Sequence, residues 1–249
     1  MVQLKGLFKL APSLAIKYFK NKNNKLSWDW YELWQDAHKK SFTVAKVMRE
    51  DILKDIRSAL DKALSEGKTF KEFSKELKPT LQKKGWWGEQ IVVDSKGNAE
   101  KVQLGSMYRL KTIYSVNMQT AYQTGRYKTQ IENKENRPYW QYVAVLDANT
   151  RPEHAQLHDL VFPCDDAFWT AFYPPNGWRC RCRVRALSDS YVKKHNLIVD
   201  SSNNRLSEEE RLVSKKSEEY KPVTVYTDPL TGKKIAPDVG WSYNPAADF

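Results

Sequence analysis

The positions of apolar residues predict helices in the first part of the chain. Over residues 27–66, which begin with a serine suited to cap a helix, apolar side chains recur at three- and four-residue spacing. Gly67 ends this pattern. Thr69 followed by Glu72 is a capping-box sequence, and it predicts a second helix that stops at Lys78-Pro79. The N-terminal half is therefore expected to be mainly helical.

The middle of the chain combines strand patterns with one long helix pattern. Residues 90–94 and 100–104 flank the turn sequence of residues 95–98, which predicts a β-hairpin. Apolar residues on one side of residues 106–132 predict a helix. Residues 139–146 form the best strand candidate in the chain.

The composition changes after residue 146. Prolines, aromatic residues, two histidines and all three cysteines gather in residues 147–188, with little regular periodicity, so this loop-rich module needs an internal staple. Residues 207–220 read as a polar helix. Residues 223–226 and 233–235 then read as a hairpin-like pair across the turn at residues 228–232.

Together these patterns predict an α+β fold, with a helical N-terminal half followed by a small, loop-rich module that contains β-strands. We divide the chain into a basic arm (residues 1–25), a mainly helical region with one hairpin (residues 26–138) and a C-terminal module (residues 139–249). A length of 249 residues is sufficient for one or two domains with a real core.

Charge adds a candidate binding surface. Lys and Arg number 41 against 30 Asp and Glu, which gives a formal net charge of +11. The first 25 residues hold no acidic residue and six lysines, namely Lys5, Lys9, Lys17, Lys20, Lys22 and Lys25. Such an arm attracts polyanions, of which nucleic acid is the usual one, and acidic protein surfaces or anionic lipids are alternatives. A solvated tail without a partner is an equally good interpretation.

Composition also excludes several classes of protein. The apolar runs are too short to cross a bilayer, and the N-terminus lacks the apolar core of a signal peptide. Three unevenly spaced cysteines do not suit a disulfide scaffold. We therefore expect a soluble intracellular product with no membrane partner.

Four residues of the loop-rich module form a candidate metal site. His154 and His158 are four residues apart, so on one helical turn both imidazoles face the same way. Cys180 and Cys182 flank one residue and share a face if that segment is extended. Two imidazoles and two thiols form the tetrahedral set that suits zinc, and four protein ligands make the site structural.

The other interpretation of these residues is reduced thiols and histidines that hydrogen-bond a loop, because structural zinc sites usually have two residues between the cysteines. Cys164 is a possible substitute ligand or, with His154, a nucleophile pair without a third group. The zinc-protease, deaminase and phosphate-loop motifs are missing. We therefore assign no catalytic residue and no small-molecule substrate.

These motifs resemble those of a known family. The chain has an Asp-x-x-Thr-Arg turn followed by His in residues 147–154, a Leu-His step at 157–158, and Pro-Pro-x-Gly-Trp-x-Cys-Arg-Cys at residues 174–182. This pattern is similar to that of the phage Mu F-like minor head (head morphogenesis) proteins, and weaker matches extend the resemblance to residues 27–245. Asp159 departs from the family, which usually has Gly after the Leu-His pair.

The resemblance implies a low-copy head component of a tailed bacteriophage or prophage. Such a protein would associate with the portal during procapsid assembly in the bacterial cytoplasm and be packaged inside the head of the virion, near double-stranded DNA. The candidate zinc ligands fall at the shared motif positions. Its mechanism would be docking on portal and head proteins, not catalysis.

Two alternatives stay open. The chain could be a DNA-binding protein in its own right that uses its basic arm. It could also be a metal-dependent nuclease or an ejected effector, which would need an open metal position with a nearby carboxylate such as Asp165 or Asp166.

Overall fold

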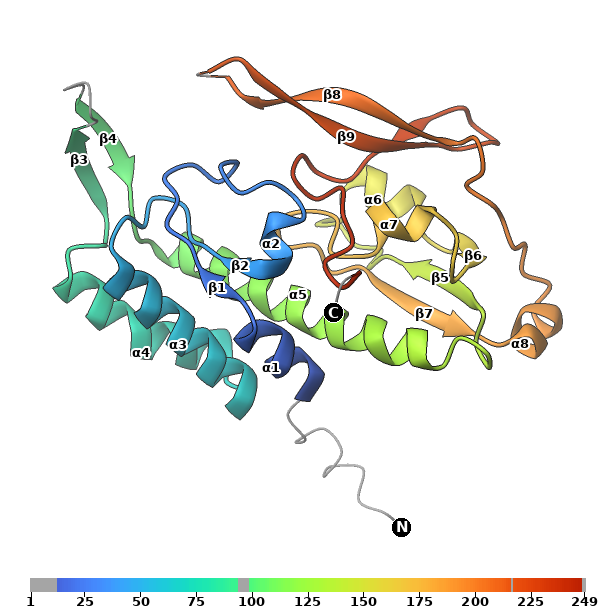
Figure 1. The fold of residues 1–249 in the computed structure, drawn as a ribbon, viewed down its shortest axis with the longest axis horizontal. Coiled ribbons are helices and arrows are strands. Elements are labelled where there is room, and N and C mark those ends of the chain that lie inside the picture. Colours follow the sequence, from blue (N-terminus) through green and yellow to red (C-terminus); the bar gives the residue numbers. More distant parts are fainter. Residues whose placement is uncertain (1–12, 94–98, 216, 248–249) are drawn as a thin grey trace, which may run out of the picture. The chain divides into compact units, whose positions relative to one another are not determined.

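The computed structural model describes residues 13–93, 99–215 and 217–247, and it confirms an α+β fold. The helices are α1 (Ser13–Lys20), α2 (Ala37–Lys40), α3 (Glu50–Glu66), α4 (Phe70–Lys83), α5 (Met107–Glu132), α6 (Pro152–Gln156), α7 (Phe168–Phe172) and α8 (Asp189–Lys194) (Figure 1). The strands are β1 (Asn23–Asn24), β2 (Ser41–Phe42), β3 (Glu89–Val93), β4 (Ala99–Gln103), β5 (Tyr139–Val143), β6 (Val161–Pro163), β7 (Arg183–Leu187), β8 (Leu206–Ser214), β9 (Glu219–Thr227) and β10 (Lys234–Ile235).

The chain divides into two compact units. The first unit contains the described residues up to Leu33 together with Lys40–Ala121. The second contains Trp34–Lys39 and the described residues from Tyr122 onward. The long helix α5 therefore gives its first residues to one core and its later residues to the other.

The first unit is built around α3, against which both α1 and α4 pack. The buried face of α3 carries residues at three- and four-residue spacing, as an amphipathic helix requires: Ile52, Leu53, Ile56, Leu60, Ala63 and Leu64. Gly67 ends α3 in the left-handed conformation, with φ of 67°. The predicted capping box is confirmed, since Thr69 and Glu72 bond each other's backbone N–H groups.

Two helix boundaries differ from the sequence prediction. Only Glu50–Glu66 of the predicted long helix is one continuous helix, because part of the preceding backbone pairs with other segments: β2 pairs with β1, and Ser27 forms a bridge with Val47. Helix α4 continues past Pro79 to Lys83. Pro79 lies on the exposed face of α4. The leucines on either side of it in the sequence, Leu77 and Leu81, are on the opposite face and remain buried.

The predicted central elements are confirmed. Strands β3 and β4 form an antiparallel hairpin with Glu89 opposite Gln103, and α5 begins one residue after the predicted start. Within the described residues, no helix is long and apolar enough to span a membrane.

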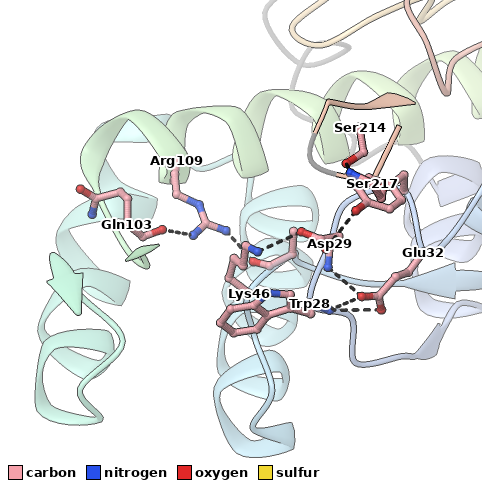
Figure 2. A network of polar contacts seen from close by, with 10 residues as sticks. Trp28, Asp29, Glu32, Lys46, Gln103, Arg109, Ser214 and Ser217 are labelled. Carbon is pink, nitrogen blue, oxygen red and sulfur yellow. Dashed lines mark hydrogen bonds and ion pairs between the residues drawn. The ribbon is translucent and has the colours of Figure 1, made fainter. Parts of the chain in front are cut away.

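A polar network in the first unit centres on Arg109 and Lys46 (Figure 2). The Arg109 guanidinium donates to the backbone carbonyls of Gln103 (2.8 Å), Leu104 and Ala45 (2.5 Å) and lies over the Trp86 ring. Burial lowers the pKa of Arg109 to about 10. One side chain thus fastens the start of α5 to two other backbone segments. Next to it, the Lys46 ammonium donates to Asp29 at 2.9 Å.

The second unit has a three-stranded antiparallel sheet in the order β6-β5-β7 (Figure 1). The central strand β5 confirms the strongest strand prediction. The core of the second unit is mainly aromatic and includes Trp140, Tyr142, Phe162, Phe168, Trp169, Phe172, Tyr173 and Tyr226. The second half of α5 reaches this core through Tyr127, whose ring lies 5.5 Å from that of Trp140.

The C-terminal region forms a second antiparallel sheet in the order β10-β9-β8. The predicted polar helix over residues 207–220 is therefore wrong, because this stretch forms β8 and the start of β9. The predicted pair across residues 228–232 is confirmed as β9 and β10. The Asp228 carboxylate accepts the N–H groups of Leu230 and Thr231 in this turn, and the Leu230 side chain is 92% exposed.

Candidate metal centre

The cysteine pair lies just before β7, the edge strand that pairs with β5. Val143 of β5 is opposite Arg183, so Cys182 directly precedes the paired residues. Both cysteines are buried, with 5% of Cys180 and 2% of Cys182 exposed, whereas Arg181 between them is exposed. This alternation confirms that a gap of one residue can put both sulfur atoms on the same side.

His154 lies on α6 and completes a buried cluster with the two cysteines. Its Nδ1 atom is 3.7 Å from the Cys180 sulfur and 3.6 Å from the Cys182 sulfur. The three ligand atoms all lie within 4.8 Å of one another. The His154 side chain is 3% exposed, and its Nε2 atom is buried without a hydrogen-bond partner. Three of the four predicted ligands thus meet.

The pKa values of the two thiols are shifted in opposite directions. The hydrogen bond from Cys180, together with the contact to His154, lowers the pKa of Cys182 well below its usual range. The same Cys180–Cys182 contact and burial raise the pKa of Cys180. Such a pair holds one thiolate readily, as expected for a soft metal ligand.

Arginine–carboxylate pairs fix the loops that carry the cluster. Arg181 donates to both oxygens of Asp147, at 2.7 and 2.5 Å, and this pairing lowers the pKa of Asp147 to about 2. Arg151, which precedes α6, donates to the carbonyl of Trp178 and to Asp238, each at 2.9 Å. These contacts connect the histidine loop with the cysteine loop at two points.

Asp238 is a positioning residue that the sequence analysis missed. Its carboxylate accepts the N–H of Trp178 at 3.2 Å, and burial raises the pKa of Asp238. A Cβ atom on Gly177 would lie only 2.3 Å from an Asp238 oxygen, so this close approach requires glycine. The residue lies about 60 positions along the chain from the cysteine loop, and no local motif indicated the contact.

His158 does not join the cluster in this structure. Helix α6 ends at Gln156, so the four-residue helical spacing that predicted two aligned imidazoles does not reach His158. The Nδ1 atom of His158 instead accepts the backbone N–H of Ala144 at 3.2 Å, and its Nε2 faces Asp159 at 3.5 Å. Asp159 has a positive φ of 66°, the conformation for which the family's usual glycine is suited.

The other candidates near the cluster have separate roles. Cys164 follows β6 and lies outside the cluster found among the described residues, and partial burial raises its pKa. His154 faces the cysteine pair, which leaves the proposed Cys164–His154 nucleophile pair without support. The Asp166 carboxylate accepts the N–H groups of Ser202 (3.0 Å) and Phe168 (2.8 Å) and so connects the start of α7 with the segment before β8.

A small pocket lies beside the cluster. It has a volume of about 10 Å³, which is room for about one water molecule. Arg151, Arg179 and Arg181 contribute to its lining with all three cluster residues, and no carboxylate is among the described lining residues. The pocket thus offers an open position next to the sulfur and nitrogen atoms of the cluster.

The described part of the basic arm, residues 13–25, is folded and contains α1 and β1. Lys5 and Lys9 lie outside the described residues. Lys17, Lys20 and Lys25 are exposed, and Lys20 pairs with Asp61 at 3.8 Å. Lys22 is only 8% exposed and lies over the Tyr18 ring; burial, with the nearby charge of Arg57, lowers its pKa to about 7. Lys22 is therefore unsuited to bind a polyanion at the surface.

Comparisons with known proteins agree with the motif pattern. The family described as "Phage Mu protein F like protein" matches residues 54–185. "Putative capsid assembly protein F" of Escherichia phage Mu is 49% identical over 96% of this chain and 55% of its own length. "Mu-like prophage FluMu F protein" of Haemophilus influenzae is 41% identical over 88% of this chain and 52% of its own length.

The chain thus spans about half the length of these curated relatives. No solved structure matches it significantly. The family match covers more than half of the chain, including the histidine and cysteine loops of the candidate metal centre. This chain belongs to the phage Mu protein F-like family.

Proposed function

We propose that this chain acts in head morphogenesis of a bacteriophage or prophage, as a minor head protein that docks on the portal during procapsid assembly. The observation that carries the proposal is the 49% identity to a protein named for capsid assembly, sustained over 96% of the chain.

The proposed partners are the portal, other head proteins and the packaged double-stranded DNA in the head interior. Net charge supports this choice, because a chain with a formal charge of +11 is attracted to DNA phosphates and to acidic protein surfaces. Lys17, Lys20 and Lys25 present part of that charge on the surface of the first unit.

The direct test uses the phage or prophage whose genome carries this chain. We expect the protein in purified procapsids at few copies per particle, with chemical cross-links to the portal subunit. Particles made without it should show malformed or empty heads by electron microscopy. Procapsids that lack the protein altogether, or normal DNA-filled heads in its absence, would contradict the proposal.

DNA binding by the exposed lysines is a second, compatible function with its own prediction. If Lys17, Lys20 and Lys25 contact phosphates, changing all three to Gln should weaken binding to duplex DNA and flatten its salt dependence. Each lost phosphate contact lowers the slope of log K against log salt by about 0.9. Fluorescence anisotropy over a salt series measures both quantities.

The control carries the same charge change elsewhere: Lys193, Lys194 and Lys233, all exposed, are changed to Gln. It should keep the affinity and the slope of the unmodified chain. Deletion of residues 1–25 is unsuitable as a test, because Tyr18 and Phe19 are buried in the core of the first unit. An equal loss of DNA affinity in both triple variants would mean that DNA binding depends on the total charge of the chain and not on this surface.

A further inference from the structure

We propose that His154, Cys180 and Cys182 bind one zinc ion through Nδ1 and the two sulfur atoms, and that a water molecule from the adjacent pocket is the fourth ligand. This set differs from the four-residue set that the sequence predicts, because His158 is replaced by solvent. The inference concerns this chain's own residues and does not depend on the role in head assembly.

The distances within the cluster match those of a zinc site. With Zn–S of about 2.3 Å and Zn–N of about 2.0–2.1 Å, a tetrahedron has an S···N edge of about 3.6 Å. The two S···N distances are 3.7 and 3.6 Å. The cluster therefore already has two edges of the tetrahedron that a zinc ion requires.

Hydrogen bonding alone explains this arrangement less well. An imidazole Nδ1 has either one N–H or one lone pair in the ring plane, so it forms one good hydrogen bond. Here two sulfur atoms approach the same Nδ1 of His154 at nearly equal distances. A metal ion placed among the three atoms satisfies all of them at once.

The protein holds the ligand atoms in place from outside the cluster. Gln123 donates to the carbonyl of Cys182 at 3.1 Å, and the Cys180 N–H donates to the carbonyl of Gly177 at 3.1 Å. The Arg181–Asp147 pair fixes the residue between the cysteines on the opposite side. Such contacts from surrounding residues orient the metal-binding side chains in metal sites. Here they fix both ends of the cysteine segment.

The fourth position is the point on which the proposal is most specific. The pocket beside the cluster holds about one water molecule and is lined by all three cluster residues. His158 is unsuited to this position because its Nδ1 already accepts the N–H of Ala144. Zinc with three protein ligands and one water is a known coordination class.

Zinc in this place would join α6 to the segment before β7 and so supply the staple that the loop-rich module needs. Thiolate and imidazole ligands select zinc over magnesium or calcium, which prefer oxygen ligands. Because binding requires the folded arrangement of three separate side chains, bound zinc should raise the melting temperature.

The test measures zinc in the purified full chain and in three variants. We expect one zinc per chain in the unmodified protein and loss of zinc to background in Cys182→Ser and in His154→Ala. The matched control is His158→Asn, whose side-chain oxygen can accept the Ala144 N–H in place of Nδ1 but is a poor zinc ligand. This variant should keep one zinc per chain.

Two further measurements do not depend on the folding of the variants. X-ray absorption at the zinc edge should show two sulfur ligands at about 2.3 Å and two nitrogen or oxygen ligands at about 2.0–2.1 Å. Removal of zinc by a chelator should lower the melting temperature, and equimolar zinc should restore it. Loss of zinc in His158→Asn would overturn the water-completed site, and failure of the unmodified chain to bind added zinc would overturn the site itself.

Discussion

Replacing Trp140 by alanine should lower the free energy of unfolding of the second unit by about 3–5 kcal/mol. Trp140 is fully buried on the central strand β5. Its ring makes edge contacts with Tyr127, Trp169 and Tyr173 at centroid distances of 5.5 to 5.7 Å. Removing the indole leaves a cavity at the point where α5, β5 and α7 meet, and the rigid aromatic neighbours cannot fill it.

Chemical denaturation followed by circular dichroism measures this effect on the full chain. The control is Leu230→Ala, which removes an apolar side chain that is 92% exposed and should change the free energy by less than about 0.5 kcal/mol. A loss below about 1 kcal/mol for Trp140→Ala would show that the aromatic core is not packed as described.

Replacing Arg109 by methionine should destabilise the first unit by about 3 kcal/mol. Methionine keeps much of the volume and the helix propensity of arginine but removes the donors to the carbonyls of Ala45, Gln103 and Leu104. The contacts with Leu104 and Ala45 are partly buried, so the loss of a charged donor leaves these two carbonyls poorly satisfied. The stacking of the guanidinium on Trp86 is lost as well.

The variant Arg109→Lys separates the effect of the positive charge from the effect of the hydrogen-bond geometry of the guanidinium. A lysine ammonium keeps the charge but cannot match the planar fork that serves three carbonyls, so we expect it to recover less than half of the loss. Lys111→Met on the exposed face of the same helix is the control and should be nearly neutral. Full stability in Arg109→Lys would mean that charge alone holds these segments together.

Local signals in the sequence predicted many of the elements correctly. The capping box at Thr69 and Glu72, the glycine stop at Gly67 and the β3–β4 hairpin each depend on a few neighbouring residues, and the structure confirms all three. The segment before Glu50 was predicted wrongly. Its apolar residues are spaced as in a helix, but its backbone pairs with distant segments, as in β1 with β2 and Ser27 with Val47, and residue spacing cannot reveal such pairing.

The stretch at residues 207–220 was misread for a related reason. Its charged residues favour a helix locally, but it lacks an apolar helical stripe. Its partner β9 buries Val223, Val225 and Tyr226, and pairing along this strand keeps the sequence extended. Strand pairing depends on context in a way that helix propensity does not.

The candidate site was predicted in part. The one-residue gap between Cys180 and Cys182 indicated a shared face, and the structure brings the predicted His154 to the same cluster. The pairing with His158 assumed that one helix carries both imidazoles. Because α6 stops at Gln156, that assumption was wrong, and only the three-dimensional path of the turn shows it. The ion pair of Asp238 with Arg151 could not be predicted from local motifs either, because the two residues are far apart in the sequence.

The exposed turn between β9 and β10 offers a labelling site that tests the proposed place of the protein in an assembled particle. A cysteine in place of Leu230 would be the most accessible thiol among the described residues, because Cys180 and Cys182 are buried and Cys164 is partly covered with a raised pKa. The Asp228 carboxylate holds the turn by accepting the backbone N–H groups of Leu230 and Thr231, so the Leu230 side chain can be replaced without loss of these hydrogen bonds. A maleimide-linked gold or fluorescent label at this single position would report where the chain sits without touching either core.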